Sequence, residues 1–263
     1  MRLSLAAFSA SLRRSAMPLL AAIAFLLLWE ALVVLFSVRP ILLPAPHLII
    51  AEIAEFPLWF LENSFYTLGI TLSGFLVAAI LGIAFAIAIV ESPAFERMIF
   101  PLFVALNSVP KVAIAPLFII WLGTGAEPKI AITTLIAVFA IVIDTALGLR
   151  SVAPDIIDLA KVLRGGRLRI LWRIKLPCAL PSLFAGLKVA MSLALVGAIV
   201  GEFVSSQKGL GYIILSAQGN FDTPRVFAAI SILAVIGLGL MGLLNMLEKM
   251  ALPWRRGRGG AHG

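Results

Sequence analysis

Long apolar stretches, separated by short polar or proline-rich segments, set the pattern of this chain. Six of them, at about 16–37, 65–90, 98–122, 129–148, 183–204 and 224–246, are long enough to be membrane-spanning helices. A helix of roughly 20 residues crosses a hydrocarbon core of about 30 Å. The pattern therefore predicts an all-α, polytopic membrane protein in which residues 1–263 form a single transmembrane domain.

Glycines recur inside two of these stretches, the second and the fifth. Small residues let membrane helices approach one another closely. We therefore expect close helix crossings at Gly74, Gly82, Gly186, Gly197 and Gly201.

The first stretch follows Arg13 and Arg14, as the apolar region of a secretory signal would. Its apolar run at 17–38 is longer than the roughly 7–15 residues of such a region, and it ends without a clear cleavage pattern. We therefore predict a retained membrane helix. Glu30 lies within it, and because a carboxylate in lipid is costly, we expect Glu30 to face another helix or a wet groove.

Several prolines break the segment between the first two stretches into short pieces, because proline lacks a backbone donor. Apolar residues then recur at helical spacing, with glutamates off the apolar stripe: Ile49, Ile50, Ile53 and Phe56 lie on it, and Glu52 and Glu55 lie off it. This pattern predicts a short amphipathic helix. It either lies at the outer membrane interface or only serves packing.

Residues 149–182, between the fourth and fifth stretches, interrupt the apolar pattern most strongly. The part at 158–181 alone holds six of the chain's 21 lysines and arginines. Pro154 suits the first turn of a helix, with Ser151 or Asp155 near its free amides. Gly165 and Gly166 then permit a sharp turn.

A second helix is predicted from about Arg167. Ile170, Leu171 and Ile174 form its apolar stripe, and Pro177 and Pro181 are expected to end it. From the residues alone, two interpretations stay open. The basic helix rests on anionic lipid, or a rigid helix-turn-helix inserts into a groove on a soluble partner.

The positive charges follow the same polar segments. With the N-terminus inside, sixteen of the 21 lysines and arginines lie on inner loops and span ends, whereas the outer side keeps Arg39, Lys129, Lys208 and Arg225. Cytoplasmic segments of membrane proteins are enriched in lysine and arginine. We therefore predict that both termini, 1–15 and the basic tail 247–263, and the loop 149–182 are cytoplasmic. The net charge of +8 then indicates contact with membrane lipid and not nucleic acid.

Motifs for catalysis, metals and nucleotides are missing from the sequence. Cys178 is the single cysteine, the two histidines are far apart, and no G-x-x-x-x-G-K-[ST] phosphate loop is present. We therefore predict a chain that is not an enzyme, binds no cofactor itself, and takes any energy from a partner.

Polar residues inside the predicted spans are candidates for a translocation pathway or gate. Lys111 follows Arg97 by 14 residues, so a straight helix would place it about 20 Å deep, beside Asn107. It could line a pathway and attract an anion. Alternatively, it pairs with Asp144 or lies on a helix that reaches the cytoplasm. Asp144 itself is a partner of the loop or gate, and Glu202 is a gate, a partner contact or an interface anchor.

The stretch "DLAKVLRGGRLRILWRIKLPCALP" resembles the EAA loop of ATP-binding cassette importer permeases. Asp158, Leu159 and Ala160 stand at the Glu-Ala-Ala positions, and Leu176 and Pro177 at the Leu-Pro positions, without a gap. Arg164 occupies the expected glycine position and is followed by Gly165 and Gly166. Arg164 is then either a new docking contact or a sign that the turn has moved to Gly165.

Further segments are similar to the nitrate, sulfonate and taurine branch of these permeases. They include "VPKVAIAPLFIIWLGTG", "DTALGLRSVAP" and "GEFVSSQKGLGYIILSAQGNFDTPRVFAA". The resemblance implies a type I importer fold in a bacterial inner membrane, a second permease copy, separate ATPase subunits that use ATP, and an extracytoplasmic binding protein. It also implies that the residues at the EAA and Leu-Pro positions and the turn couple to the ATPase.

The function expected from the resemblance is import of a small organic or inorganic anion of the sulfonate, taurine or nitrate type. A non-anionic small molecule carried by the same family is the alternative. A secondary transporter that works without an ATPase is a second rival, although no clear inverted repeat is visible. A membrane enzyme is a third, but no nucleophile–base or metal set supports it.

Overall fold

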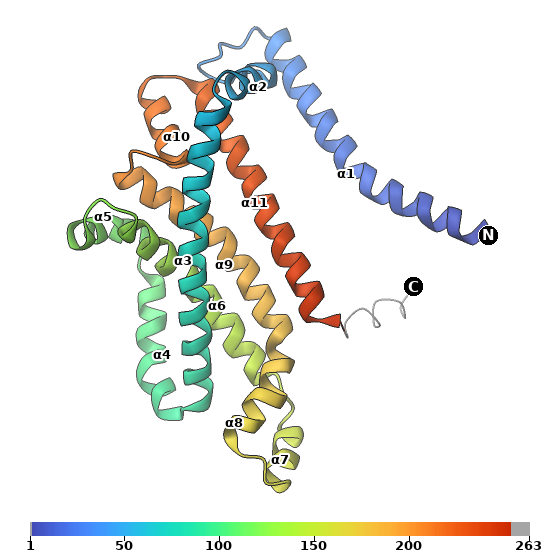
Figure 1. Cartoon of the computed structure of the whole chain (residues 1–263), viewed down its shortest axis with the longest axis vertical. Helices are drawn as coiled ribbons and strands as arrows, with labels where there is room; N and C mark the ends of the chain where they lie inside the picture. The colour runs from blue at the N-terminus through green and yellow to red at the C-terminus, as the bar shows by residue number, and fades with distance from the viewer. Residues whose placement is uncertain (1, 254–263) are drawn as a thin grey trace. The chain divides into compact units, whose positions relative to one another are not determined.

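The computed structural model describes residues 2–253, and its side chains are described at Met17 and from Leu20 onward. Every regular element in this part of the chain is a helix (Figure 1). The elements are α1 (Arg2–Leu35), α2 (Pro46–Glu55), α3 (Pro57–Glu91), α4 (Pro93–Ser108), α5 (Lys111–Leu122), α6 (Glu127–Arg150), α7 (Pro154–Val162), α8 (Arg167–Ile170), a π-helical turn (Leu171–Lys175), α9 (Leu176–Ser205), α10 (Leu210–Gly219) and α11 (Thr223–Ala251).

The chain forms two compact units. The small unit comprises residues up to Leu61 together with 213–231, and the large unit comprises 62–212 and the residues from Ile232 onward. The loop at 149–182 and all the pathway candidates lie in the large unit.

Four helices in the large unit, α3, α6, α9 and the second half of α11, share one apolar core. Ala78 of α3, Ile141 of α6 and Ala190 of α9 are fully buried in it, and Leu240 and Leu244 come from α11. Between helices in a bilayer the stabilisation comes from van der Waals packing and not from removal of water, because lipid tails are themselves apolar. This core fixes the relative positions of the helices that carry the candidate site.

Close helix crossings occur at the predicted glycines. A Cβ added to Gly197 of α9 would lie 2.7 Å from the Cα of Thr133, which is closer than real carbon atoms approach. A Cβ added to Gly74 of α3 would also collide with Thr133, so this residue of α6 packs between a glycine of α3 and a glycine of α9. Gly82, Gly186 and Gly201 also face α6 at distances that leave no room for a side chain. The prediction of glycine-mediated packing is confirmed.

Four of the predicted spans are confirmed as long apolar helices. Within the described residues, Pro57–Glu91, Glu127–Arg150, the continuous helix Arg167–Ser205 and Thr223–Ala251 are long and apolar enough to cross a membrane. In α1 the described apolar part, Leu20–Leu35, is shorter. The count of six spans therefore stays a prediction.

The predicted third span is not a straight helix. It is broken into α4 and α5, which are bent by 99° at Val109 and Pro110. Val109 has an extended backbone (φ −75°, ψ 133°), as steric contact with a following proline ring favours. The 20 Å depth expected for Lys111 assumed a straight helix and is wrong.

The prolines after the loop do not end a helix, contrary to prediction. Residues 167–205 run as one helix through Pro177 and Pro181. In a regular α-helix, the Pro177 ring would clash with the carbonyl of Arg173. The chain instead makes a π turn, in which the Leu176 N–H donates to the Leu171 carbonyl five residues back. A wider turn immediately before a proline is a recognised way to accommodate it.

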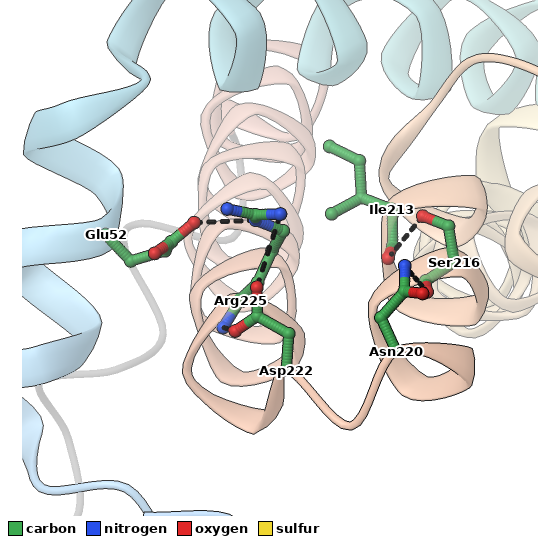
Figure 2. Close-up of polar contacts among 6 residues, drawn as sticks. All are labelled: Glu52, Ile213, Ser216, Asn220, Asp222 and Arg225. Atoms are coloured by element: carbon green, nitrogen blue, oxygen red, sulfur yellow. Dashed lines mark hydrogen bonds and ion pairs between the residues drawn. The ribbon is translucent and has the colours of Figure 1, made fainter.

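In the small unit, Arg225 of α11 organises the polar contacts. Its Nε donates to Glu52 Oε1 of α2 at 2.6 Å, and its Nη1 lies 3.2 Å from Asp222 Oδ2 (Figure 2). The guanidinium also lies over the rings of Phe56 and Trp59, 5.3 and 5.8 Å from their centroids. The predicted short helix is confirmed as α2, but its apolar stripe is only partly buried: Ile49 is buried, whereas Ile50 and Phe56 are exposed. The off-stripe Glu52 contacts α11 through Arg225.

Glu30 of α1 faces another helix, as its cost in lipid predicted. Its Oε1 lies 2.6 Å from His47 Nδ1, and its Oε2 accepts the His47 backbone N–H at 3.2 Å. His47 lies in the first turn of α2. Glu30 therefore caps the N-terminus of that helix, where backbone N–H groups favour negative charge.

Candidate functional site: the loop, the helix break and the buried carboxylate

The turn between α7 and α8 is a Schellman motif. The Arg164 N–H donates to the Lys161 carbonyl at 2.9 Å, and the Gly165 N–H donates to the Ala160 carbonyl at 2.8 Å. Arg164 lies in the left-handed region with φ 56°. This is the position at which glycine usually ends a helix. The turn has therefore not moved to Gly165, and Arg164 adopts the glycine-like conformation itself.

Gly165 has a different role, which is to allow a close approach. A Cβ at Gly165 would lie 2.7 Å from the Ala160 carbonyl oxygen, whereas one at Gly166 would meet nothing within 4 Å. Only the first glycine is therefore sterically required. Its hydrogen bond and the left-handed Arg164 fix the angle between the two short helices.

Of the two residues predicted near the free amides of α7, Asp155 lies in its first turn, whereas Ser151 does not cap it. Ala153 is the N-cap and makes no side-chain hydrogen bond, and Pro154 lies in the first turn as predicted. The Ser151 hydroxyl instead donates to the Gly148 carbonyl at 2.8 Å. Ser151 thus closes the end of α6, and the start of α7 relies on a proline that needs no acceptor.

The outer face of the loop is apolar and exposed, despite its basic composition. Asp158 is exposed and pairs with Lys161 one turn on, Nζ to Oδ1 at 2.8 Å, so it makes a local surface pair. The large apolar side chains on this face have half or more of their surface exposed: Leu159, Val162, Leu163, Leu168 and Trp172. The sequence reasoning missed Val162, Leu168 and Trp172. The spacing of Leu168 and Trp172, four residues apart, was the available signal.

The base of the loop is packed. Ile170 and Leu171 are buried, as the predicted apolar stripe requires. Leu176, at one of the Leu-Pro positions, packs against a cluster of Leu149, Leu171 and Ala179. Leu176 and the half-buried Pro177 therefore hold the loop against α6 and do not extend its exposed face. Cys178, the next residue, is exposed.

Ion pairs tie this end of the large unit together. Lys175 pairs with Glu91 of α3, and only 15% and 24% of the two side chains are exposed. Arg150 at the end of α6 pairs with Glu96 of α4 at 2.6 Å, and Lys188 of α9 pairs with Glu248 of α11. The base of the loop is thus linked by charge to α3 and through α9 to α11.

Lys111 lies at the break between α4 and α5. Its Nζ donates to the Asn107 carbonyl at 3.0 Å and to Asn107 Oδ1 at 2.9 Å, and it lies 4.6 Å from the centroid of the Phe139 ring on α6. The structure therefore brings the predicted Asn107 and Lys111 together. The lysine closes the C-terminal turn of α4, where carbonyls lack helical partners.

Asp144 does not pair with Lys111. Among the described residues, no cation lies within ion-pair distance of its carboxylate. Asp144 is half-buried on α6 and faces Gly186 of α9, where an added Cβ would lie 2.7 Å from the Asp144 Cβ. The structure therefore separates this pair, which sequence reasoning had offered as an alternative.

Glu202 is an anchor for the N-terminus of α10. It is 1% exposed, accepts a hydrogen bond from Thr67 Oγ1 at 2.8 Å, and accepts the Gly211 N–H at 2.7 Å. The neighbouring amides donate to Asn63 Oδ1 from Gly209 and to Thr67 Oγ1 from Leu210. Side chains of α3 and α9 thus satisfy three consecutive amides, and the carboxylate stabilises the positive end of a helix.

The sequence of the segment before α10 suits this contact. Gly209 has φ +102°, and any Cβ on it would collide with the Glu202 carboxylate. These buried contacts within the chain are not among the three alternatives predicted for Glu202, and its roles as a gate or partner contact stay predictions.

Comparison with known proteins assigns this architecture. Residues 78–251 match the family model described as the binding-protein-dependent transport system inner membrane component. The chain belongs to this family.

Three relatives resemble this permease over most of its length. It is 32% identical to the formylaminopyrimidine transport permease protein ThiX of Halalkalibacterium halodurans, over 91% of this chain and 96% of that one. It is 34% identical to the riboflavin transport system permease protein RibX of Chloroflexus aurantiacus, over 87% and 86%. It is 32% identical to the putative aliphatic sulfonates transport permease protein SsuC of Bacillus subtilis, over 87% and 83%.

A solved structure shows the same fold. The permease resembles a chain of the inward-facing MetNI methionine ABC transporter with a TM-score of 0.68 at 14% identity, over 75% of this chain and 98% of that one. This likeness shows the type I importer fold, and the family match shows a multi-pass transport permease. The named relatives differ in substrate, so the family assignment leaves the substrate open.

Proposed function

We propose that this permease forms the translocation pathway of an ATP-driven importer and couples to separate ATPase subunits through the loop at 149–182. The observation that supports this most is the exposed apolar face of the loop, with Leu159, Leu168 and Trp172 on a turn of fixed geometry. Exposed apolar groups on a rigid helix pair are the features that helix-in-groove recognition uses. A helix resting on lipid would not need the fixed turn.

The proposed mechanism is a lever. The loop continues without a break into α9, and Lys175 joins its base to α3. When ATP closes the partner subunits, the docked loop moves as a rigid body and the spans exchange one packing for another. ATP must bind more tightly to one of these packings for the change to occur.

The proposal includes a second permease copy, an extracytoplasmic binding protein and cytoplasmic termini. The family description names binding-protein dependence, and the positive charges gather on one set of loops. The arginines of 1–15 and 254–263 fall outside the residues whose side chains the structure describes.

An assembly assay tests the coupling proposal. The permease is co-expressed with its cognate ATPase, and Leu168→Ala and Trp172→Ala are compared with wild type. We expect both variants to weaken co-purification and substrate-stimulated ATP hydrolysis about thirtyfold, since a hot-spot side chain contributes about 2 kcal/mol. Val235→Ala, an equally exposed change on α11, is the control. Unchanged assembly and stimulation in both variants would refute loop docking.

For the substrate we propose a small anion, sulfonate-like in charge. Lys111 supports this, because it adds a positive charge at a helix break beside α6, and SsuC is a relative with a sulfonate name. A neutral ring compound is the second candidate, supported by the names of ThiX and RibX.

A ligand survey of the neighbouring binding protein separates the two candidates. Calorimetric titration with taurine, methanesulfonate, nitrate, riboflavin and a formylaminopyrimidine should give saturable heat for one of the anions. Binding of only riboflavin or the pyrimidine would replace the anion proposal with the ring-compound one. Uptake into vesicles that contain the permease without any ATPase would overturn the importer itself.

A further inference from the structure

An open pocket of about 520 Å³ lies in the large unit, at the end of the spans opposite the loop. It lies beside the start of α6, whereas the loop follows the end of that helix, and 24 helical residues separate the two ends by about 36 Å. Two lysines, Lys129 and Lys208, line it, and none of the nine described lining residues is acidic. The pocket therefore presents positive charge without a carboxylate in its wall.

Lys129 is a buried cation whose hydrogen-bond acceptors are neutral. It is 2% exposed, and its Nζ donates to the carbonyls of Thr124 at 3.2 Å and Gly125 at 2.8 Å. Among the described residues, no carboxylate oxygen lies within 4 Å of this nitrogen. A buried charge is costly unless it is paired. Lys129 is therefore a buried cation without an ion-pair partner in the described part of the chain, and an anionic ligand would supply one.

The nearby acidic residues do not take that place. Glu202 is close enough to attract Lys129, but its two oxygens accept hydrogen bonds from Thr67 and Gly211. Glu62 pairs with the exposed Lys208 at 3.3 Å, and Glu127 is exposed outside the pocket lining. Glu127 does approach the lining residue Gly125, but none of these three carboxylates forms an ion pair with Lys129.

Ser205 provides an independent observation. It lines the same pocket, and its hydroxyl oxygen is buried without a hydrogen-bond partner among the described residues. A buried hydroxyl without a hydrogen-bond partner is costly, so a ligand that accepts its hydrogen would recover that cost. Tyr66, whose ring centroid lies 5.9 Å from Lys129 Nζ, forms another part of the wall.

We propose that this pocket binds the oxyanion group of a small solute, with Lys129 as its charge partner and Ser205 as a hydrogen-bond donor. A sulfonate or a carboxylate fits this chemistry, because either offers several acceptor oxygens and a negative charge. The inference rests on the proposed import function, in which an anion that arrives from the side opposite the loop meets the permease at this pocket.

Fluorine NMR of the full chain in lipid nanodiscs tests the proposal. The probe is trifluoromethanesulfonate, and the neutral control is trifluoroethanol. We expect saturable broadening of the anion signal, displaced by methanesulfonate, and no saturable broadening of the alcohol. Lys129→Gln should weaken binding about tenfold or more, since hydrogen bonds to charged groups contribute about 1.5–3 kcal/mol. Lys161→Gln, which removes an exposed cation from the loop at the opposite end, should leave binding unchanged.

Ser205→Ala keeps the test decisive if Lys129→Gln does not fold. A merely structural Ser205 predicts unchanged binding, whereas the proposal predicts binding weakened about fivefold with an unchanged or raised melting temperature, because the variant removes an unsatisfied hydroxyl. Non-saturable broadening, or equal binding in wild type and either variant, overturns the site. Because the titration needs no ATPase, failed assembly with the ATPase refutes the importer and leaves this result standing.

Discussion

Within residues 2–253, three helices end in the left-handed conformation at a residue other than glycine: Ser37, Arg164 and Phe221. In each case the next amide donates back into the last helical turn, from Val38 to Val33, Gly165 to Ala160 and Asp222 to Ala217. The left-handed region costs a non-glycine residue about 1 kcal/mol or more. These turns are therefore maintained by their surroundings and not by local preference.

Arg164 combines a strained backbone with an exposed cation, and two substitutions separate these roles. Arg164→Gly and Arg164→Asn both suit the left-handed conformation and both remove the charge. We expect each to retain ATPase assembly and to raise the unfolding free energy by about 1 kcal/mol or less. Loss of assembly in both, measured by co-purification, would show instead that the guanidinium is a docking contact.

Gly165 and Gly166 make a matched pair for the turn. Gly165→Ala places a methyl 2.7 Å from the Ala160 carbonyl, whereas Gly166→Ala enters open space. We expect the first to weaken ATPase co-purification and to destabilise the fold by about 1–3 kcal/mol, and the second to be nearly neutral. Thermal unfolding in detergent measures both, and equal melting temperatures would contradict the steric role assigned to Gly165.

The sequence was a poor guide to such single-residue features. Adjacent glycines drew the predicted turn toward Gly165, yet the hydrogen bonds place the left-handed residue at Arg164. The anchoring role of Glu202 was equally hidden, because its partner Thr67 lies 135 residues away along the chain. Local patterns carry no information about such distant contacts.

At the scale of elements, prediction succeeded wherever an apolar run was long and uninterrupted. The helices α3, α6 and α11 follow directly from hydropathy. Prediction failed at prolines, in opposite directions. The helix breaks at Pro110, inside a predicted span, whereas Pro177 and Pro181 lie within a continuous helix. A proline restricts its own turn, but tertiary packing decides whether the helix resumes on the same axis.

The crossing of α6 and α9 is sensitive to added volume. Gly197→Ala would place a methyl 2.7 Å from the Thr133 Cα, whereas Gly239→Ala on α11 meets nothing within 4 Å. We expect the first to lower stability by about 1–3 kcal/mol and the second to raise it slightly through helix propensity. Melting temperatures of the purified variants provide the comparison, and a neutral Gly197→Ala would show that the helices can separate freely.

The anchoring of α10 requires that both oxygens of the Glu202 carboxylate accept hydrogen bonds. Glu202→Gln turns one of them into an amide donor, which cannot accept from Thr67 or Gly211. We expect a loss of about 1–3 kcal/mol in stability and faster amide hydrogen exchange at 209–212. The neighbouring exposed Phe203, changed to Leu, is the control. Unaltered exchange in Glu202→Gln would remove the anchoring role.

At the scale of the whole molecule, coupling requires that the loop and the spans move together. The Lys175–Glu91 pair is the direct charge link between the loop base and α3. Either single reversal, Lys175→Glu or Glu91→Lys, leaves two like charges in a half-buried site, which we expect to lower ATP-driven uptake at least tenfold. The double swap should recover much of it. Equal defects in single and double variants would mean that the pair is not a link.

Composition predicted the class of this molecule well, because a helical bundle in lipid requires long apolar runs and polar loops. The family resemblance of the chain was confirmed by the match over 78–251. The substrate could not be reached in this way. The residues that would select it, such as Lys129, are separated along the chain and meet only in the folded bundle.

Cys178 makes these motions measurable. It is the single thiol of the chain, is exposed, and directly follows the packed Leu176 and Pro177 at the start of α9. A maleimide spin label would therefore attach at one place per chain, with no engineered cysteine. In the proposed pair of permeases, pulsed electron–electron double resonance would measure the distance between two such labels. A change in this distance between nucleotide states would report how far the bases of the two loops move apart.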